Sequence, residues 1–307
     1  MAFTETFTLK PQAPLDFALT CQVFSDGNPT VRNYLDGEFN QVLQINDTLV
    51  LIKAHHSGTT KNPCLTITLK SNLPLTTQTK QAAKDTLSYI FNLNFDLTPF
   101  YCEVQNDPIM HKITQHLCGF KFPTTATAFE GLVDAIVEQQ ISIKVARTIE
   151  ERLAKRFGRK LKINNETYSA FPCAQALTDS SLSDIRECGL SQRKAEYIHN
   201  AAECITEGRL DLEAMKTNPD PAGIIRVLDE LRGIGPWTAE LTLLRGMQRW
   251  DILPADDFGI RRVISTYYYR GTPIKAADAR ETAKIWGKWQ GLAAFYLILA
   301  EAKGITV

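Results

Sequence analysis

The sequence lacks a long hydrophobic run, a leader-like start and any compact group of metal-binding side chains. No stretch approaches the roughly 18 apolar residues of a membrane span, and MAFTETFTLK lacks the charged-then-apolar layout of a signal peptide. No two of the seven cysteines are closer than fifteen residues, which excludes CxxC-type zinc and iron–sulfur sites. The five histidines form neither HExxH nor HxxEH. We therefore expect a cytoplasmic protein with reduced, mostly buried thiols, no metal site and no membrane partner.

The sequence also lacks a net charge of either sign, because 34 Lys and Arg residues balance 34 Asp and Glu residues. The balance is uneven: residues 1–108 carry 7 basic and 10 acidic side chains, and residues 109–307 carry 27 and 24. The second part is mildly basic, which permits a nucleic-acid partner without requiring one. At 307 residues and 44% apolar side chains, the chain is long enough for about two domains.

The first hundred residues are typical of an antiparallel sheet with a few helices. In CLTITLK, residues 64–70, leucine and isoleucine alternate with threonine, which is the period-2 pattern of a half-buried strand. Residues 42–54 predict a hairpin that turns at Asn46 and Asp47, and residues 78–93 predict a helix. We therefore expect an α+β domain over residues 1–108, followed by a linker near 100–110.

Residues 109–307 are typical of helices separated by glycine and proline. The longest predicted helix covers residues 127–158 and starts with Thr127 and Glu130 at capping-box spacing. Further helices are predicted over residues 193–205, 224–233, 236–246, 257–268 and 293–302. The second domain should therefore be all-α.

The stretch LRGIGPWTAE, residues 231–240, places two glycines two positions apart at the start of a predicted helix. Glycine lets the chain reverse sharply with positive φ. Pro236 has no N–H to leave unused, and the remaining free N–H groups and the helix dipole favour an anion such as a phosphate. The same residues would also serve as an ordinary turn between two helices.

This stretch, the helix after it and LPADDFG at residues 253–259 resemble the helix-hairpin-helix/Gly-Pro-Asp superfamily of DNA glycosylases. Within it the sequence looks like the 3-methyladenine DNA glycosylase II family, whose PxxDxG motif matches Pro254 to Gly259. FEGLVDAIVEQQISIKVARTIEERL, residues 129–153, is similar to the family's long helix. The resemblance is strong over residues 110–305. The first hundred residues resemble the family's TATA-binding-protein-like N-terminal domain only in length and strand content.

The resemblance makes Asp257 the catalytic carboxylate, which would stabilise an oxocarbenium-like sugar and orient or deprotonate water. Asp257 also opens a predicted helix, so it is a candidate cap, and Asp256 is its rival. Bifunctional relatives hold a Schiff-base lysine where this chain has Trp237, so the indole implies hydrolysis by water. Its face also suits a cationic alkylated purine. A tryptophan that merely fills the hairpin is the alternative.

The resemblance further implies residues that hold the flipped base. Phe258 would form a second wall of the base pocket, and Tyr296 would replace a tryptophan that the family often has in its last long helix. Gln140 would fill the gap that the flipped base leaves, and Ser142 would contact the DNA backbone. The alternative for the glutamine pair is buried amides that tie helix ends together, and this suits Gln139 better than Gln140.

Phosphate contacts are expected at the hairpin, from Gly233, Gly235 and the neighbouring N–H groups. The resemblance implies that no cofactor is required, but that a monovalent cation can lie between the hairpin carbonyls and the phosphate. Four basic side chains are further candidates for DNA contacts: Arg245, Arg249, Arg261 and Arg262.

The sequence thus predicts a monomeric, monofunctional glycosylase that flips alkylated purines such as 3-methyladenine out of double-stranded DNA and releases them by hydrolysis. This would initiate base excision repair, close to the nucleoid in a bacterium or an archaeon. A non-catalytic helix-hairpin-helix DNA-binding protein is an alternative, against which PADD at catalytic spacing argues. A glycosylase for oxidised bases with lyase activity is another, against which Trp237 and the lack of a C-terminal cysteine cluster argue.

Overall fold

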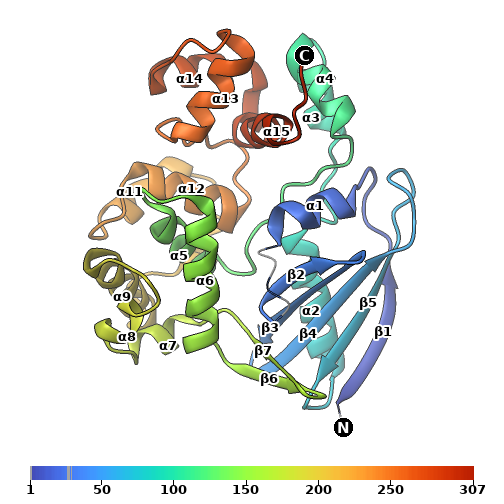
Figure 1. The fold of residues 1–307 in the computed structure, drawn as a ribbon, viewed down its shortest axis with the longest axis vertical. Coiled ribbons are helices and arrows are strands. Elements are labelled where there is room, and N and C mark those ends of the chain that lie inside the picture. Colours follow the sequence, from blue (N-terminus) through green and yellow to red (C-terminus); the bar gives the residue numbers. More distant parts are fainter. Residues whose placement is uncertain (1, 26–27, 29) are drawn as a thin grey trace.

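The computed structural model describes residues 2–25, 28 and 30–307. A sheet domain and one helical lobe lie side by side, and a second helical lobe lies at one end of the long axis of the molecule (Figure 1). We call them the sheet domain, the middle lobe, which contains the helices of residues 128–247, and the C-terminal lobe, which contains the helices of residues 98–116 and 258–302. The N-terminus lies at the far end of the sheet domain, and the C-terminus lies in the C-terminal lobe.

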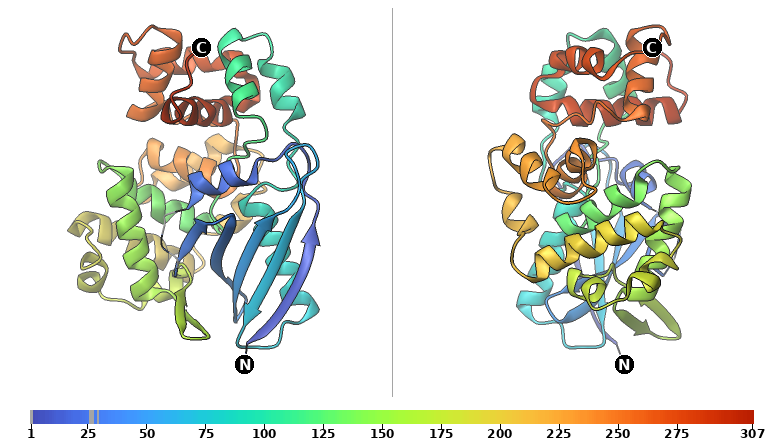
Figure 2. Two further views of the ribbon diagram at one scale, coloured as in Figure 1. Left: turned by 45° about the vertical axis from the view of Figure 1, so that its right-hand side comes forward. Right: turned by 90° about the vertical axis from the view of Figure 1, so that its left-hand side faces the viewer.

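The sheet domain contains a five-stranded antiparallel sheet of order β1-β5-β4-β3-β2. Its strands are β1 (Phe3–Leu9), β2 (Arg32–Leu35), β3 (Glu38–Ile45), β4 (Thr48–His56) and β5 (Leu65–Ser71). Helices α1 (Phe17–Phe24) and α2 (Thr77–Ile90) contribute to one core with the sheet, and α2 runs across its face (Figure 2). The predicted α+β domain with an antiparallel sheet is confirmed.

Local patterns in the sheet domain were predicted correctly because side chains alternate between faces of a strand. In β5, Leu65, Ile67 and Leu69 all enter the core beneath α2. The β3–β4 hairpin turns at residues 46 and 47, with Asn46 at a φ of 51°. On the opposite face, a short hairpin of β6 (Lys160–Ile163) and β7 (Glu166–Ser169) packs against Val42, Leu49 and Leu51. No pattern in the sequence predicted this second hairpin.

The middle lobe buries its own core between eight helices. They are α5 (Ala128–Glu138), α6 (Ile143–Phe157), α7 (Ala174–Thr178), α8 (Leu182–Arg186), α9 (Gln192–Thr206), α10 (Leu212–Met215), α11 (Pro221–Asp229) and α12 (Pro236–Met247). Thr127 caps α5 as predicted, because its hydroxyl accepts the N–H of Glu130 at 3.1 Å.

The prediction of one helix over residues 127–158 was wrong. The helix ends at Glu138, and Gln140 lies at a φ of 56°, which no α-helix accommodates. Ser142 then caps α6 by accepting the N–H of Val145 at 3.4 Å. Two helices therefore meet at a tight turn, and the turn places Gln140 on the surface.

The C-terminal lobe combines two segments that are far apart in the sequence, residues 98–116 and residues 258–302. Its helices are α3 (Thr98–Val104), α4 (Pro108–His116), α13 (Phe258–Tyr268), α14 (Ala276–Ala283), η1 (Lys284–Trp289) and α15 (Gln290–Ala302). Phe100 from α3 and Ile113 from α4 share one core with Trp286 and Tyr296. The boundary at residue 108 stays a prediction, and both helices that flank it pack in this lobe.

The cysteines depart from the expected burial, since Cys21, Cys188 and Cys204 are buried, Cys64 is half-buried and the remaining three are exposed. All seven are free thiols. In the part of the chain that the structure describes, no helix has the length and apolar character needed to cross a bilayer.

Candidate active site

The turn between α11 and α12 forms a corner of the middle lobe. Helix α11 ends at Asp229, and the chain reverses at Gly233, where φ is 86°. Ile234 is buried and anchors the turn in the core. Gly235 has a φ of −89°, so only the first glycine needs the left-handed conformation that both were expected to permit.

The N-terminus of α12 is open. Within the described ranges no side chain caps it, and Pro236 takes the first helical position. A Cβ added at Gly235 would meet no atom within 4 Å, so the space on the Cβ side of this glycine is open. Free N–H groups at a helix N-terminus attract anions, which suits the predicted phosphate contact.

Asp257 lies at this corner, although twenty residues separate it from Trp237. It precedes α13, and its Oδ1 accepts the N–H of Ile260 at 2.9 Å. Its Oδ2 accepts the indole Nε1–H of Trp237 at 3.1 Å. The carboxylate is half-buried. Asp257 therefore caps α13, as expected for one of its roles, and also belongs to the hairpin corner.

Trp237 is half-buried and contacts Asp257 through the edge of its ring. An edge contact leaves the two faces of the indole unused by this hydrogen bond. Trp237 provides no amine for covalent attack on a sugar, and its role as a wall of the base pocket stays a prediction.

The neighbours of Asp257 differ from it in their contacts. Asp256 is exposed and lies 3.4 Å from Nη2 of Arg280, so it belongs to an ion pair instead of the hairpin corner. Phe258 is 72% exposed, which is unusual for a large apolar side chain, and it stays a prediction as a wall of the base pocket.

The structure does not support Tyr296 as a wall of the base pocket. Its side chain is fully buried, and its hydroxyl donates to the carbonyl of Phe120 at 2.6 Å. Its ring packs between those of Phe100 and Phe120. Its position in α15 was predicted from the sequence, but only the tertiary packing directs its ring into the core. Trp286 and Trp289 are buried in the same core.

The turn between α5 and α6 lies against the hairpin. Nε2 of Gln139 donates to the carbonyl of Gly233 and to Oγ1 of Thr238, both at 3.0 Å. Gln139 therefore ties two helix ends together, as its alternative role predicted. Gln140 and Ser142 are exposed beside it and remain candidates for DNA contacts. Lys194 holds the same turn from α9, since its Nζ donates to the carbonyl of Gln139 at 2.6 Å.

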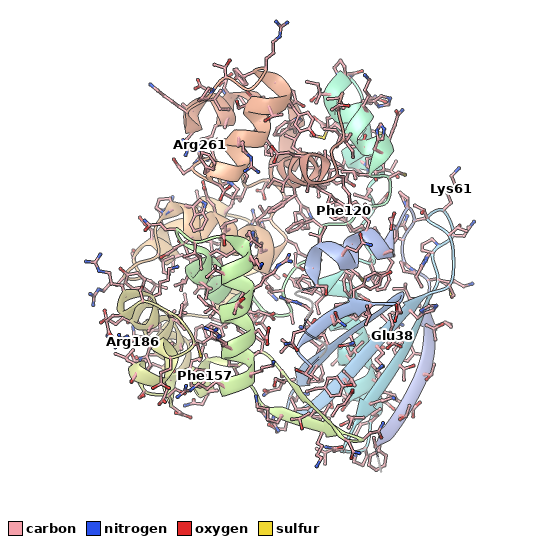
Figure 3. The ribbon with its side chains drawn as sticks, in the orientation of Figure 1. Glu38, Lys61, Phe120, Phe157, Arg186 and Arg261 are labelled. Carbon is pink, nitrogen blue, oxygen red and sulfur yellow. The ribbon has the colours of Figure 1, made fainter. Side chains whose placement is uncertain are left out.

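The candidate arginines have different environments. Arg245 forms an ion pair with Glu138 inside the middle lobe, and Arg249 pairs with Asp251 at 3.1 Å. Arg245 is therefore a structural residue and not a DNA contact. Arg262 is half exposed and pairs with Glu301 at 2.6 Å, so it stays a candidate. Arg261 extends from α13 in the C-terminal lobe (Figure 3).

The monovalent cation implied by the resemblance would need hairpin carbonyls. The carbonyl of Gly233 accepts from Gln139, and that of Leu231 accepts from the N–H of Ile234 at 3.0 Å. Each carbonyl oxygen retains a second lone pair, and the cation stays a prediction. Among the described residues, no group of three or more His, Cys, Asp or Glu side chains is placed to hold a metal ion.

A cavity of about 540 Å³ lies elsewhere, between β3 of the sheet domain and α5 of the middle lobe. Phe129, Phe171 and Gln41 line it, and none of its lining residues comes from the hairpin or from the loop that carries Asp257. It is therefore separate from the candidate active site.

Sequence reasoning missed Glu240 and Arg280, which lie beside the candidate active site. Nη2 of Arg280 donates to Oε1 of Glu240 at 3.1 Å, and Glu240 is only 7% exposed. Burial raises the pKa of the Glu240 carboxyl, and the charge of Arg280 opposes that rise. A glutamate inside the apolar run AELTLL was the one available signal for this pair.

Comparisons with known proteins agree with this geometry. A model of the HhH-GPD superfamily of base excision DNA repair proteins matches residues 133–288, just over half of the chain. A DNA-3-methyladenine glycosylase of Bacillus subtilis is 29% identical over 208 residues, which cover 67% of this chain and 68% of that protein.

Two solved structures share the fold across the whole chain. A 3-methyladenine DNA-glycosylase from Archaeoglobus fulgidus gives a TM-score of 0.85 at 26% identity and covers 98% of this chain and 100% of that one. An 8-oxoguanine glycosylase/lyase of Clostridium acetobutylicum in complex with double-stranded DNA gives 0.78 at 19% identity and covers 99% of each chain, which shows the fold alone. The chain therefore belongs to the HhH-GPD superfamily of base excision DNA repair proteins.

Proposed function

We propose that the protein is a monofunctional DNA glycosylase that releases cationic alkylated purines, such as 3-methyladenine, from double-stranded DNA by hydrolysis. The observation that carries the proposal is the contact between Asp257 and Trp237 at the hairpin corner. It places a carboxylate and an indole beside a helix N-terminus suited to a phosphate. The names of the alkyladenine glycosylases among its relatives support this substrate class.

In the proposed site, backbone N–H groups bind the DNA and side chains act on the damaged nucleotide and the gap that it leaves. The N–H groups at Gly235 and at the start of α12 hold a phosphate of the damaged strand. The damaged nucleotide rotates out of the duplex, since its C1′ is inaccessible inside the base stack. Gln140, exposed on the turn beside the hairpin, occupies the space that the base leaves.

The chemical step is cleavage of the bond between the base nitrogen and C1′. The bonding electron pair leaves with the base, and a cationic alkylpurine thereby becomes neutral, so the base needs no proton from the enzyme. Positive charge develops on the sugar, where the carboxylate of Asp257 stabilises it. Water then adds to C1′, and its proton passes to Asp257 or to solvent.

Trp237 determines the reaction class in this proposal. An indole cannot form a Schiff base, so water is the nucleophile and the DNA strand stays intact. The faces of the ring are suited to stack on a cationic base, an attraction of up to about 2 kcal/mol in a desolvated site. A single exposed wall, Phe258, completes the proposed slot.

The test is incubation of the protein with methylated duplex DNA. We expect free methylpurines by chromatography and no strand nicks on a denaturing gel before alkali treatment. Borohydride in a parallel reaction should trap no covalent protein–DNA adduct. A trapped adduct would replace the hydrolytic proposal with a lyase, and the absence of any released base would leave a DNA-binding protein without glycosylase activity.

A further inference from the structure

Asp257 belongs to a loop that crosses between the two helical lobes. Within it, the N–H of Ala255 donates to the carbonyl of Leu253 at 2.7 Å, and that of Asp257 donates to the carbonyl of Pro254 at 2.9 Å. The middle lobe lies before the loop and α13 of the C-terminal lobe follows it. Any shift of one lobe against the other would therefore change the position of the Asp257 carboxylate relative to the hairpin.

Arg280 contacts this loop from the C-terminal lobe. Helix α14 carries it, and the neighbouring Ala279 and Ala283 are buried in the core of that lobe. Nη1 of Arg280 donates to the carbonyl of Leu253 at 3.1 Å, and Nη2 lies 3.4 Å from Oδ2 of Asp256. The guanidinium thus contacts the loop of residues 248–257 at Leu253, near its middle, and at Asp256, directly before Asp257.

The same guanidinium reaches α12. Its Nη2 donates to Oε1 of Glu240 at 3.1 Å. Glu240 follows Trp237 by three residues, so both side chains lie on one side of the helix. Glu240 is almost fully buried, and the planar fork of arginine can hold several acceptors in fixed directions at once.

We propose that Arg280 is a positioning residue, which together with Glu240 fixes the Asp257 loop to the hairpin helix α12. The proposal rests on the proposed role of Asp257 as the catalytic carboxylate. Two connections then join α12 to the loop: the hydrogen bond from Trp237 to Asp257, and the Glu240–Arg280 bridge to Leu253 and Asp256. The bridge holds the loop when the indole turns to stack on a base.

The first test follows the indole N–H signals of the ¹⁵N-labelled protein by NMR, which needs no enzymatic activity. The chain has four tryptophans, and Trp237→Phe identifies the signal of Trp237. We expect Arg280→Gln to shift or broaden that signal and to leave the signals of Trp286 and Trp289, which lie outside the loop, in place. A general loss of structure would instead disturb all four.

The second test measures single-turnover release of base with enzyme in excess over methylated DNA. Arg280→Gln should slow release roughly tenfold to hundredfold, because misplacement of a reacting group by about 1 Å has effects of this size. Affinity for the DNA should stay within about threefold, since Arg280 is not a proposed DNA contact.

The matched control is Arg156→Gln. Arg156 also binds two carboxylates, those of Asp184 and Glu187, and its side chain is 38% exposed compared with 44% for Arg280. It precedes Phe157 at the end of α6, in the middle lobe and far from α14 (Figure 3). This variant should change neither the Trp237 signal nor the rate of base release.

A double variant separates the effect of Arg280 on the position of the Asp257 loop from its effect on the stability of the protein. Replacing both charges with apolar side chains, as in Arg280→Leu with Glu240→Leu, removes the bridge without leaving a buried carboxylate unpaired, which is often neutral for stability. We expect a melting temperature close to that of the native protein and base release as slow as in Arg280→Gln. It also serves if Arg280→Gln alone fails to fold.

The outcomes separate the two proposals. If the native protein releases base and Arg280→Gln matches Arg156→Gln in both measurements, or if all four indole signals change together, the positioning role is overturned. If the native protein releases no base while Arg280→Gln selectively moves the Trp237 signal, the bridge holds the loop as proposed, and the glycosylase proposal is what fails.

Discussion

Gly233 lies against the ring of Tyr197, so closely that a Cβ added to the glycine would come within 2.3 Å of the ring carbons. The same glycine has a φ of 86°, whereas Gly235, two residues later, has an ordinary φ of −89° and open space in front of it. The two glycines of the hairpin therefore differ: Gly233 is required for the turn, and we propose that Gly235 keeps the helix N-terminus accessible to a phosphate.

Gly233→Ala and Gly235→Ala should accordingly separate folding from DNA binding. Gly233→Ala should lower the free energy of unfolding by about 1–3 kcal/mol, because of backbone strain and the clash with Tyr197. Gly235→Ala should leave stability within about 0.5 kcal/mol, but weaken DNA binding, because its methyl group occupies the path of the phosphate. Urea denaturation and fluorescence anisotropy measure the two effects. Equal affinity of Gly235→Ala and native protein for DNA would contradict the phosphate site.

Asp257→Asn should abolish base release, with a loss of at least about a hundredfold in the single-turnover rate, because an amide cannot stabilise the positive sugar. The amide oxygen can still accept the N–H of Ile260, so α13 should keep its cap and the protein its melting temperature. Affinity for methylated DNA should be retained. Asp85→Asn, at an exposed position on α2 of the sheet domain, is the control that should release base normally.

Trp237→Phe should slow base release by about tenfold, because phenylalanine lacks the N–H that holds Oδ2 of Asp257 while it retains a flat ring. A slower single-turnover rate at unchanged DNA affinity is the expected pattern. If the rate is unchanged, the hydrogen bond has no part in placing the carboxylate and the ring alone matters.

Gln139→Leu should reduce stability, whereas Gln140→Ala should reduce base release and leave stability unchanged. The first leaves the carbonyl of Gly233 without its side-chain donor, so the free energy of unfolding should fall by about 1–2 kcal/mol. The second removes an exposed side chain and keeps a Cβ at the same φ, so stability should hold and base release from duplex DNA should fall. Release from single-stranded DNA, which has no stack to refill, tests whether Gln140 acts on the duplex.

Glu150→Gln should remove a pH dependence of stability. Burial, followed by the charge of Glu138, raises the pKa of the Glu150 carboxyl from 4.5 to about 7, although Arg32, Arg245 and Arg147 oppose the rise. The neighbouring Asp134 is also buried, and burial raises the pKa of its carboxyl as well.

Between pH 4.5 and 7 the folded protein therefore retains a proton that the unfolded chain has lost, so stability falls as pH rises through this window. Glu150→Gln should be more stable than the native protein by about 3 kcal/mol at pH 8, and nearly equal to it below pH 4.5. Urea denaturation at both pH values measures this, with Glu5→Gln on the exposed strand β1 as control. If the free energy of unfolding depends on pH in the same way for Glu150→Gln and for the native protein, the group that retains the proton is not Glu150.

Local sequence determined most of the elements. The alternation in residues 64–70, the turn at Asn46 and the helix that begins at Pro236 follow from backbone preferences and periodicity, which act over a few residues. The motifs around Gly233 and Asp257 also identified the corner where the proposed chemistry takes place. The local elements and the motifs depend on residue types and on short spacings, and both can be taken from a single sequence.

Tertiary structure decided the rest. The break at Gln139 depends on hydrogen bonds to Gly233 and Thr238, which lie more than ninety residues away in the chain, and no helical periodicity contains that information. The burial of Tyr296 depends on Phe100 and Phe120. The Glu240–Arg280 bridge joins side chains forty residues apart. Contacts of this range arise only when lobes pack, because packing, and not local preference, selects the direction in which each side chain points.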